Sequence, residues 1–410
     1  MAVGPVSKII ARQAGSLGII HLNRPKAYHA LDTEMVYSLQ NILKDWQKKD
    51  HKDLQAFILK SNPAKRPTFC SGGDVKSIAL DVKNNVYLEH GQGKSGLVSA
   101  DFFRSEYHVN HALANLNKTQ ISLWDGLVFG GGVGISIYGK YRVATENTLF
   151  AMPETAIGFF PDVGALYQMP KLMPSTAMVS YLVLTGHRLQ PADLLYSGLA
   201  THYVPSKDLE TMEEALEMVL APPNQHRGMG DDVIEPVLES FNRTEEIKEK
   251  RENCFLAQNA SAIDQAFGDL NRPLEQVVES LDDGSTFGAQ TLETLQKMSP
   301  TAMKITWELL RCGAGVATSA PTPTNLADHL ALEYRLSQHL MKHGSDFHEG
   351  IRAALLDSKK KNKLPAQWNP PTLNQVSDAH VQSYYFGQPI QAEWTANDSP
   401  IFTEFKESRL

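Results

Sequence analysis

Two carboxylic acids, Glu154 and Asp162, lie in an apolar segment rich in proline and glycine, residues 151–165. A carboxylate in apolar surroundings resists ionisation, so its pKa rises and it becomes useful as a base or nucleophile near neutral pH. A proline immediately precedes each acid and fixes the backbone there. The pattern predicts a pocket that both acids face. The alternative is that Glu154 starts a turn and Asp162 caps a helix beginning near Val163.

Two glycine-rich loops are candidates for binding a carbonyl oxygen. In residues 68–78 an apolar strand end runs into two glycines, of which Gly73 is the second, followed by Asp74. In residues 126–136 three consecutive glycines, with Gly131 in the middle, precede an expected helix. Bare glycines let an oxygen approach free backbone N–H groups, so Gly73 and the glycine triplet are candidates for supplying the two donors of an oxyanion hole. The alternatives are a glycine turn with Asp74 as a helix cap, and a packing glycine run or phosphate cradle.

Alternating strands and helices are expected to position these loops. Short apolar runs predict strands, and an apolar stripe capped by Asp32 or Thr33 predicts a helix between the first two strands. The glycine run is expected to open a helix over about residues 132–138. The strands are expected at residues 18–22, 56–60, 121–126, 141–145 and 148–152. Further helices are expected at residues 191–198, 209–219, 243–251, 292–312 and 326–342.

Composition restricts the class of protein. A 410-residue chain with 42% hydrophobic residues can bury a sizeable core, and a net charge of −7 argues against nucleic acid as the main partner. No apolar run is long enough to span a membrane. The cysteines have an odd count and no metal-ligand spacing, which indicates a reducing interior and no metal site; they are Cys70, Cys254 and Cys312.

The domain and localisation predictions follow from the order of these features. We expect a core with the site in residues 1–220, a mainly helical region in residues 221–385 and a tail in residues 386–410. The chain ends Ser408-Arg409-Leu410, which is similar to a peroxisomal Ser-Lys-Leu address. We therefore expect a peroxisomal protein, with the mitochondrial matrix as the alternative.

Taken together, these segments resemble the crotonase (enoyl-CoA hydratase/isomerase) superfamily. The resemblance rests on two glycine loops followed by a Pro-Glu, and on the N-terminal stretch "HLNRPKAYHALD". Within the superfamily the chain is similar to the 3-hydroxyisobutyryl-CoA hydrolases through "FFRSEY", "GGGVGIS", "RVATENTLFAMPETAIGFFPDVGA" and "RLSQHLMKHGSDFHEGIRAALLDSKK". It departs from the pattern at Tyr28-His29 and at Ala165, which bears on substrate choice more than on reaction type.

The resemblance implies an α/β fold, a crotonase-like spiral of repeated ββα units with a helical C-terminal region. It implies that Gly73 and Gly131 supply the oxyanion hole. Glu154 takes the place of the catalytic glutamate and Asp162 that of its partner. Glu106 takes the third acidic position, so that Glu106, Gly131, Glu154 and Asp162 line the substrate pocket.

The resemblance also implies a reaction. Hydratases of the superfamily place a glutamate two residues after the glycine triplet, where this chain has Gly134. We therefore expect hydrolysis of the thioester of 3-hydroxyisobutyryl-CoA, and of 3-hydroxypropionyl-CoA, as in valine catabolism. No cofactor is implied, since CoA is part of the substrate, and Lys26 or Lys76 is a candidate for contacting its phosphates. The alternatives are a hydratase or isomerase, and a non-catalytic subunit such as one of a mitochondrial ribosome; a homo-oligomer is left open.

Overall fold

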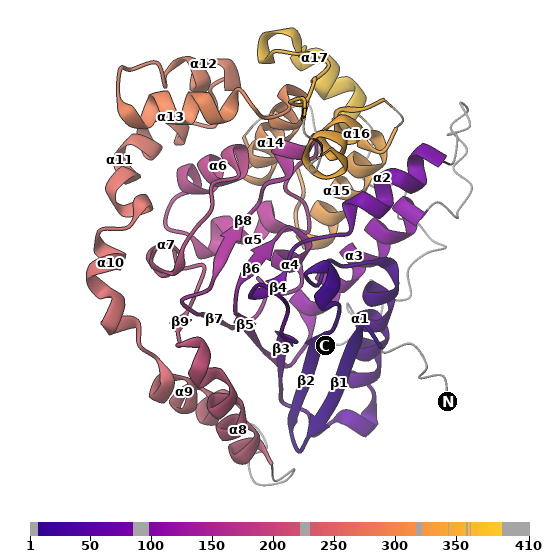
Figure 1. The fold of residues 1–410 in the computed structure, drawn as a ribbon, viewed down its shortest axis with the longest axis vertical. Coiled ribbons are helices and arrows are strands. Elements are labelled where there is room, and N and C mark those ends of the chain that lie inside the picture. The colour runs from indigo at the N-terminus through magenta and orange to yellow at the C-terminus, as the bar shows by residue number, and fades with distance from the viewer. Residues whose placement is uncertain are drawn as a thin grey trace. The chain divides into compact units, whose positions relative to one another are not determined.

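The computed structural model describes residues 7–84, 98–221, 230–316, 322–342, 344–357, 360 and 362–387. The chain folds into two compact units, each assembled from three separated segments, and Figure 1 labels their elements. The first unit comprises Met1–Gly73, His108–Phe150 and Leu189–Gln258. The second comprises Asp74–Tyr107, Ala151–Arg188 and Asn259–Leu410. The linear division at residues 220 and 385 stays a prediction alongside this grouping, and Ser408–Leu410 lie outside the described residues.

A six-stranded sheet forms the centre of the first unit. Its order is β1-β2-β3-β5-β7-β9, and every neighbouring pair is parallel except β1 with β2. The predicted strands at residues 18–22, 56–60, 121–126 and 141–145 all belong to it. The observed bounds are β1 Ile9–Ala14, β2 Leu17–Leu22, β3 Ala56–Ser61, β5 Thr119–Trp124, β7 Tyr141–Ala144 and β9 His202–Tyr203.

A three-stranded sheet, ordered β4-β6-β8, alternates with the large one along the chain. Its strands are β4 Thr68–Cys70, β6 Leu127–Phe129 and β8 Leu149–Ala151. Each repeat gives one strand to the large sheet, the next to the small sheet, and then a helix. These helices are α2 Val75–Asn84, α4 Gly131–Gly134 and α5 Ala165–Leu172. The predicted α/β spiral of ββα units is therefore confirmed.

The helix after the glycine triplet is shorter than predicted. It spans Gly131–Gly134 instead of residues 132–138, and turns follow it. Glycine has a poor helix propensity, so a segment that is mostly glycine does not extend the helix.

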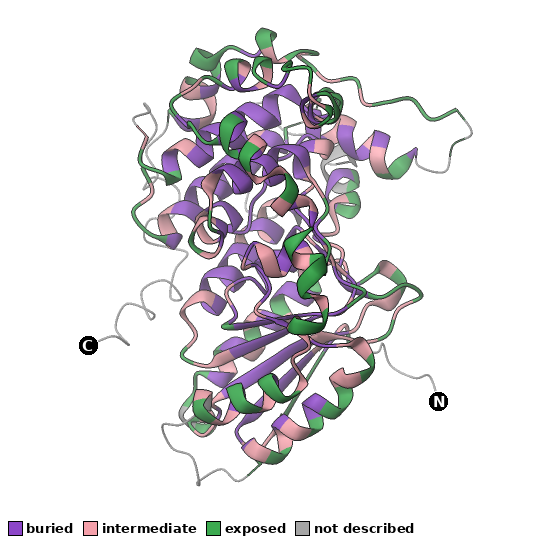
Figure 2. Cartoon of the chain, turned by 90° about the vertical axis from the view of Figure 1, so that its left-hand side faces the viewer, coloured by how far each residue is buried: buried purple, intermediate pink, exposed green. Residues whose placement is uncertain are grey.

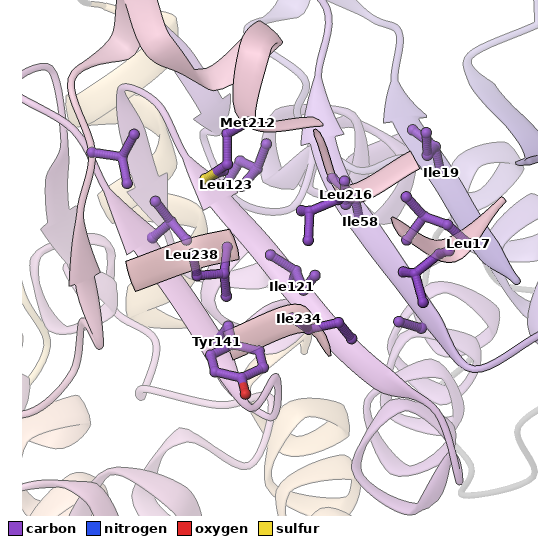
Figure 3. Packing of buried hydrophobic residues seen from close by; sticks show 14 residues of the cluster. Leu17, Ile19, Ile58, Ile121, Leu123, Tyr141, Met212, Leu216, Ile234 and Leu238 are labelled. Carbon is purple, nitrogen blue, oxygen red and sulfur yellow. The ribbon is translucent and has the colours of Figure 1, made fainter. Parts of the chain in front are cut away.

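One face of the large sheet is covered by α8 (Leu209–Leu220) and α9 (Gly230–Phe241). Figure 3 shows this core, in which Met212 and Leu216 of α8 pack with Ile58 and Ile121 of the strands. Burying such aliphatic side chains contributes about 1.5–3 kcal/mol each. The core therefore holds the strands of the large sheet together with the two helices that cover it.

Helix α1 (Thr33–Trp46) packs against the same sheet through its C-terminal end. Asp32 caps it by accepting the Met35 N–H at 3.0 Å, which decides between the two predicted caps. Gly18 permits the approach of the Trp46 ring, because a Cβ at residue 18 would lie 2.6 Å from it.

The second unit is mainly helical, and it includes residues 259–385 of the region that was predicted to be helical. Helix α14 (Pro300–Gly313) buries nearly all of its residues, and α15 (Leu326–Leu340) buries most of its own. Figure 2 colours the chain by burial, with buried residues in purple. The helices of this unit include α3 Val98–Asn115, whose first part belongs here, α6 Thr176–Thr185, α11 Phe255–Phe267, which crosses from the first unit, α12 Leu274–Glu279, α13 Thr286–Leu295, α14 Pro300–Gly313, α15 Leu326–Leu340 and α16 Asp346–Ile351.

The helical segment predicted at residues 292–312 is broken into two helices. Ser299 accepts the Ala302 N–H at 3.0 Å, and Pro300 follows it as the first residue of α14. A serine cap followed by proline is a strong helix start, so α13 ends before it. Of the other predictions, α7 is Pro191–Tyr196, and residues 244–252 form a 3-10 turn followed by α10 (Lys248–Glu252).

Within the described residues, none of the helices combines the length and the apolar character that crossing a membrane requires.

Candidate active site

The two glycine loops of the first unit follow the adjacent parallel strands β4 and β6. The Gly72 carbonyl accepts the Leu31 N–H at 2.8 Å, and the Ser71 N–H donates to Tyr28 O at 3.1 Å. Gly72 has φ +104°, and a Cβ on it would lie 3.9 Å from the Gly131 nitrogen. The loops that carry Gly73 and Gly131 are therefore neighbours, as an oxyanion hole requires.

The N–H groups of Gly73 and Gly131 donate no hydrogen bond to any part of the chain that the structure describes. Gly131 is the first residue of α4, where the N–H has no intrahelical partner. Gly132 lets α4 pack on β4, because a Cβ there would lie 2.7 Å from that of Cys70. Both N–H groups are available to a ligand oxygen, and their role as oxyanion donors stays a prediction.

The unusual pair Tyr28-His29 helps to shape the first loop. Both residues have positive φ, 51° and 55°, and His29 O accepts the Cys70 thiol at 3.1 Å. The departure from the family pattern thus lies in the segment that supports the Gly73 loop. Asp74 caps α2 by accepting the Ser77 N–H at 3.2 Å, as its capping alternative predicted.

The three predicted acids lie together in the second unit. Glu154 starts the 3-10 turn η3 (Glu154–Ile157), Asp162 lies in the turn before α5, and Glu106 lies on α3. Their exposed fractions are 7%, 5% and 2%. Aromatic rings pack in the same region: Phe159 stacks on Phe160 with centroids 4.6 Å apart and on Phe103 at 5.3 Å. The apolar surroundings predicted for the acids are present.

Close backbone packing fixes the turn that carries Glu154. A Cβ on Gly158 would lie 2.3 Å from the Asp346 carbonyl carbon, and one on Gly350 would lie 2.3 Å from that of Ile157. The two glycines allow η3 and α16 to touch backbone to backbone. The C-terminal motif that resembles the hydrolases therefore positions Glu154.

Burial and mutual repulsion shift the pKa values of these carboxyls. Burial raises the pKa of Asp162 to about 8, with a further increase from the charge of Glu333 and a decrease from the Tyr107 hydroxyl. Burial and then Asp162 raise the pKa of Glu154. Burial raises the pKa of Glu106, and the neighbouring carboxylates raise it further. The three carboxyls therefore bind protons more readily than free carboxyls do, and the ionisation of one affects the others.

Asp162 does not cap a helix. Helix α5 has Gly164 as its N-cap without a side-chain hydrogen bond, whereas an Asp162 carboxylate oxygen accepts the Tyr107 hydroxyl at 2.8 Å. The capping alternative for Asp162 is therefore wrong. Glu154 does start a turn, and it is at the same time a buried acid.

Two carboxylate oxygens in this group, Oε2 of Glu154 and Oε1 of Glu106, are buried and have no hydrogen-bond partner among the described residues. Buried polar atoms are nearly always paired in native proteins. These oxygens are thus available to a polar group of a bound ligand.

The sequence patterns did not identify Tyr107 and Glu333 as residues of the site. Glu333 is fully buried on α15 and accepts the Gly164 N–H at 2.9 and 3.2 Å. Most of its neighbours in "LALEYRL" are apolar, although Arg335 is charged; an acid among apolar residues is the signal that identified Glu154. Tyr107 directly follows Glu106 and had no distinguishing pattern.

The two candidate CoA-binding lysines, Lys26 and Lys76, are exposed, and their role stays a prediction. No group of three or more potential metal ligands occurs within the described ranges.

Replacing Asp162 with Asn is expected to make stability less sensitive to pH. The folded-state pKa of Asp162, about 8, lies above the value of 3.8 that is usual for an aspartate side chain. Its contribution is therefore fully present below about pH 4 and is lost as pH rises through about 8. Asn does not titrate, so the fall in Tm between pH 5 and pH 8.5 should be smaller than in the wild type. Scanning calorimetry measures this, and an equal fall in both proteins would contradict the shifted pKa.

The same variant should change the pH dependence of any reaction that needs ionised Glu154. The Asp162 charge raises the Glu154 pKa, so the acidic limb of the activity profile should move to lower pH. The surface variant Asp282→Asn is the control and should leave both measurements unchanged.

Comparison with known proteins agrees with this architecture. The enoyl-CoA hydratase/isomerase family matches residues 17–385. The chain therefore belongs to the enoyl-CoA hydratase/isomerase family.

Within this family, the chain is similar to proteins named as hydrolases of one acyl-CoA thioester. The chain is 38% identical over 376 residues to a Xenopus tropicalis protein named 3-hydroxyisobutyryl-CoA hydrolase, mitochondrial, covering 91% of this chain and 87% of that one. It is 37% identical to the Gallus gallus protein of the same name, covering 92% and 88%. Among solved structures, a carnitinyl-CoA dehydratase from Mycobacterium thermoresistibile is similar with a TM-score of 0.74 and 28% identity, covering 96% of this chain and 100% of that one.

Proposed function

We propose that this protein hydrolyses the thioester of 3-hydroxyisobutyryl-CoA to the free 3-hydroxy acid and CoA, and that 3-hydroxypropionyl-CoA is a second substrate. The observation that carries the proposal is the buried group of Glu106, Glu154 and Asp162, in a chain that also has the paired glycine loops. The curated relatives named as this hydrolase support it over most of the chain.

The glycine loops polarise the thioester carbonyl. The N–H groups of Gly73 and Gly131 donate hydrogen bonds to its oxygen, and the bonds strengthen as negative charge develops there. One such donor contributes about 3 kcal/mol to transition-state stabilisation in comparable sites. Because the N–H groups belong to loops fixed by β4 and β6, little reorganisation is needed during the reaction.

Glu154 acts on the carbonyl carbon, either by direct attack to give a mixed anhydride or by activating water. Both routes need an ionised Glu154 and expel CoA as a thiolate. Because the pKa of a free thiol is about 8.5, this leaving group does not need a second acid at the position of Gly134. Burial raises the Glu154 pKa, which makes it a stronger base when ionised.

Asp162 and Glu106 bind the 3-hydroxyl group of the substrate. With a pKa of about 8, Asp162 is mostly protonated at neutral pH, so it can donate a hydrogen bond as well as accept one. The unpaired Oε1 of Glu106 accepts from the substrate hydroxyl. An acyl-CoA that lacks the hydroxyl would leave buried polar groups without partners, which explains selectivity.

A hydratase or dehydratase is the second candidate, because the similar structure from Mycobacterium thermoresistibile is that of a carnitinyl-CoA dehydratase. Gly134, where hydratases place their second glutamate, favours hydrolysis. The buried acid group favours an enzyme over a non-catalytic structural subunit, because unpaired buried carboxylates destabilise a fold.

For the compartment, the mitochondrial names of the relatives favour the matrix. The peroxisomal assignment from the C-terminal tripeptide stays a prediction.

The test is thiol release from 3-hydroxyisobutyryl-CoA, isobutyryl-CoA and crotonyl-CoA, followed with a disulfide dye. We expect rapid release from the hydroxylated thioester, with kcat/KM at least about 10²-fold lower for isobutyryl-CoA because its binding leaves polar groups unpaired. Hydration of crotonyl-CoA with CoA retained would instead favour the hydratase.

A further inference from the structure

The turn that carries Asp162 has an unfavourable backbone. Val163 has φ +58°, in the left-handed region, and Gly164 follows with φ +70°. Glycine adopts this conformation freely, but a β-branched residue is rarely found there. Such strained residues persist only where surrounding contacts hold them, and they cluster at functional sites.

The contact that holds this turn comes from a distant part of the chain. The Gly164 N–H donates to both carboxylate oxygens of Glu333, at 2.9 and 3.2 Å. Glu333 is 0% exposed and lies on α15, 169 residues further along the sequence. Because both carboxyl oxygens of Glu333 lie within hydrogen-bond distance of this N–H, the contact anchors a strained loop to a buried helix.

Titratable side chains from α15, α3 and the Asp162 turn surround Glu333. His329, one helical turn earlier, has its Nε2 3.2 Å from Glu333 Oε1, and the Tyr167 ring contacts that histidine with centroids 5.9 Å apart. The His329 contact is close but lacks hydrogen-bond geometry, since both ring nitrogens have no hydrogen-bond partner among the described residues. The charge of Glu333 raises the pKa values of Glu106 and Tyr107 on α3, and it also raises the pKa of Asp162 in the turn.

We propose that Glu333 is a positioning residue for the acid group: by holding the Gly164 N–H it fixes the strained turn and thereby the place of the Asp162 carboxyl. This inference deepens the proposed function and rests on it for the assignment of Asp162 to the substrate. In this role Glu333 acts through the Gly164 N–H.

The test compares Glu333→Ala, Glu333→Gln and a matched control. Ala removes the acceptor, so amide hydrogen exchange of Gly164 should become at least about tenfold faster, and kcat/KM should fall by about 10- to 100-fold because Asp162 is displaced. Gln keeps an oxygen for the Gly164 N–H but removes the charge. It should retain slow exchange, and its kcat/KM profile should shift to lower pH because the charge that raises the pKa values of Asp162 and Glu106 is gone.

The control is Glu308→Gln. Glu308 is another buried glutamate, on α14, and it is not among the groups whose charge shifts the pKa values of Glu106, Glu154 or Asp162. It should leave Gly164 exchange and the pH profile unchanged. A Glu333→Ala protein with wild-type exchange and kcat/KM would overturn the inference. If that variant does not fold, an unshifted pH profile in Glu333→Gln would overturn it. Absence of thiol release by the wild-type protein would instead overturn the proposed function, and the exchange measurement would still decide whether Glu333 anchors the turn.

Discussion

Replacing Glu154 with Gln is expected to lower kcat for thiol release from 3-hydroxyisobutyryl-CoA by about 10³-fold or more, since the group that attacks or activates water is lost. Gln has nearly the same shape, so the turn η3 and its packing on α16 should be retained. The KM should change little, because the carboxylate acts mainly in the transition state. Steady-state kinetics with the disulfide dye measure both constants.

The control for this substitution is again Glu308→Gln, which removes a buried glutamate from a different helix and should keep wild-type kcat. A Glu154→Gln protein with normal turnover would show that the assignment of Glu154 is wrong. The two routes are separated by repeated turnover in ¹⁸O-labelled water: a mixed anhydride hydrolysed at the enzyme carboxyl carbon places the label in the peptide that carries Glu154, whereas direct activation of water does not.

Replacing Gly131 with Pro is expected to lower kcat by about 10²- to 10³-fold, because proline removes one of the two N–H donors. The first position of a helix tolerates proline, since its N–H has no intrahelical partner. The hydrogen bonds that define α4, from the Gly134 N–H to Gly130 O and from the Ile135 N–H to Gly131 O, do not use the lost group.

The matched control is Gly131→Ala, which adds a Cβ but keeps the N–H. The ratio of the kcat values of the two variants isolates the donor from the added bulk. Equal kcat values, with both proteins folded by circular dichroism, would contradict the role of Gly131 as an oxyanion donor.

The order of strands and helices was largely predictable from local patterns. The apolar runs at β2, β3, β5 and β7 and the Asp32 cap of α1 are short-range signals, and each appears where predicted. The errors have local causes. Glycine-rich α4 ends early, and the Ser299-Pro300 pair starts a new helix where one continuous segment was expected.

The candidate site was predictable only in part. The acids Glu106, Glu154 and Asp162 are marked by their motifs, and the structure places them together. Whether Asp162 caps a helix or faces a pocket depended on where the next helix begins, and local preference allowed both. In the structure Val163 has a left-handed backbone conformation and Gly164 is the N-cap of α5. The Asp162 carboxylate therefore meets the Tyr107 hydroxyl instead of capping the helix.

The sequence by itself determined the class of this protein: the glycine loops, the Pro-Glu and the strand pattern predict an acyl-CoA enzyme with a ββα spiral. Only the tertiary structure decided how the acid group is held and charged. Glu333 meets Gly164 across 169 residues, and helical periodicity carries no information about such a distant partner. The pKa values depend on burial and on neighbouring charges, which exist only once the chain has folded.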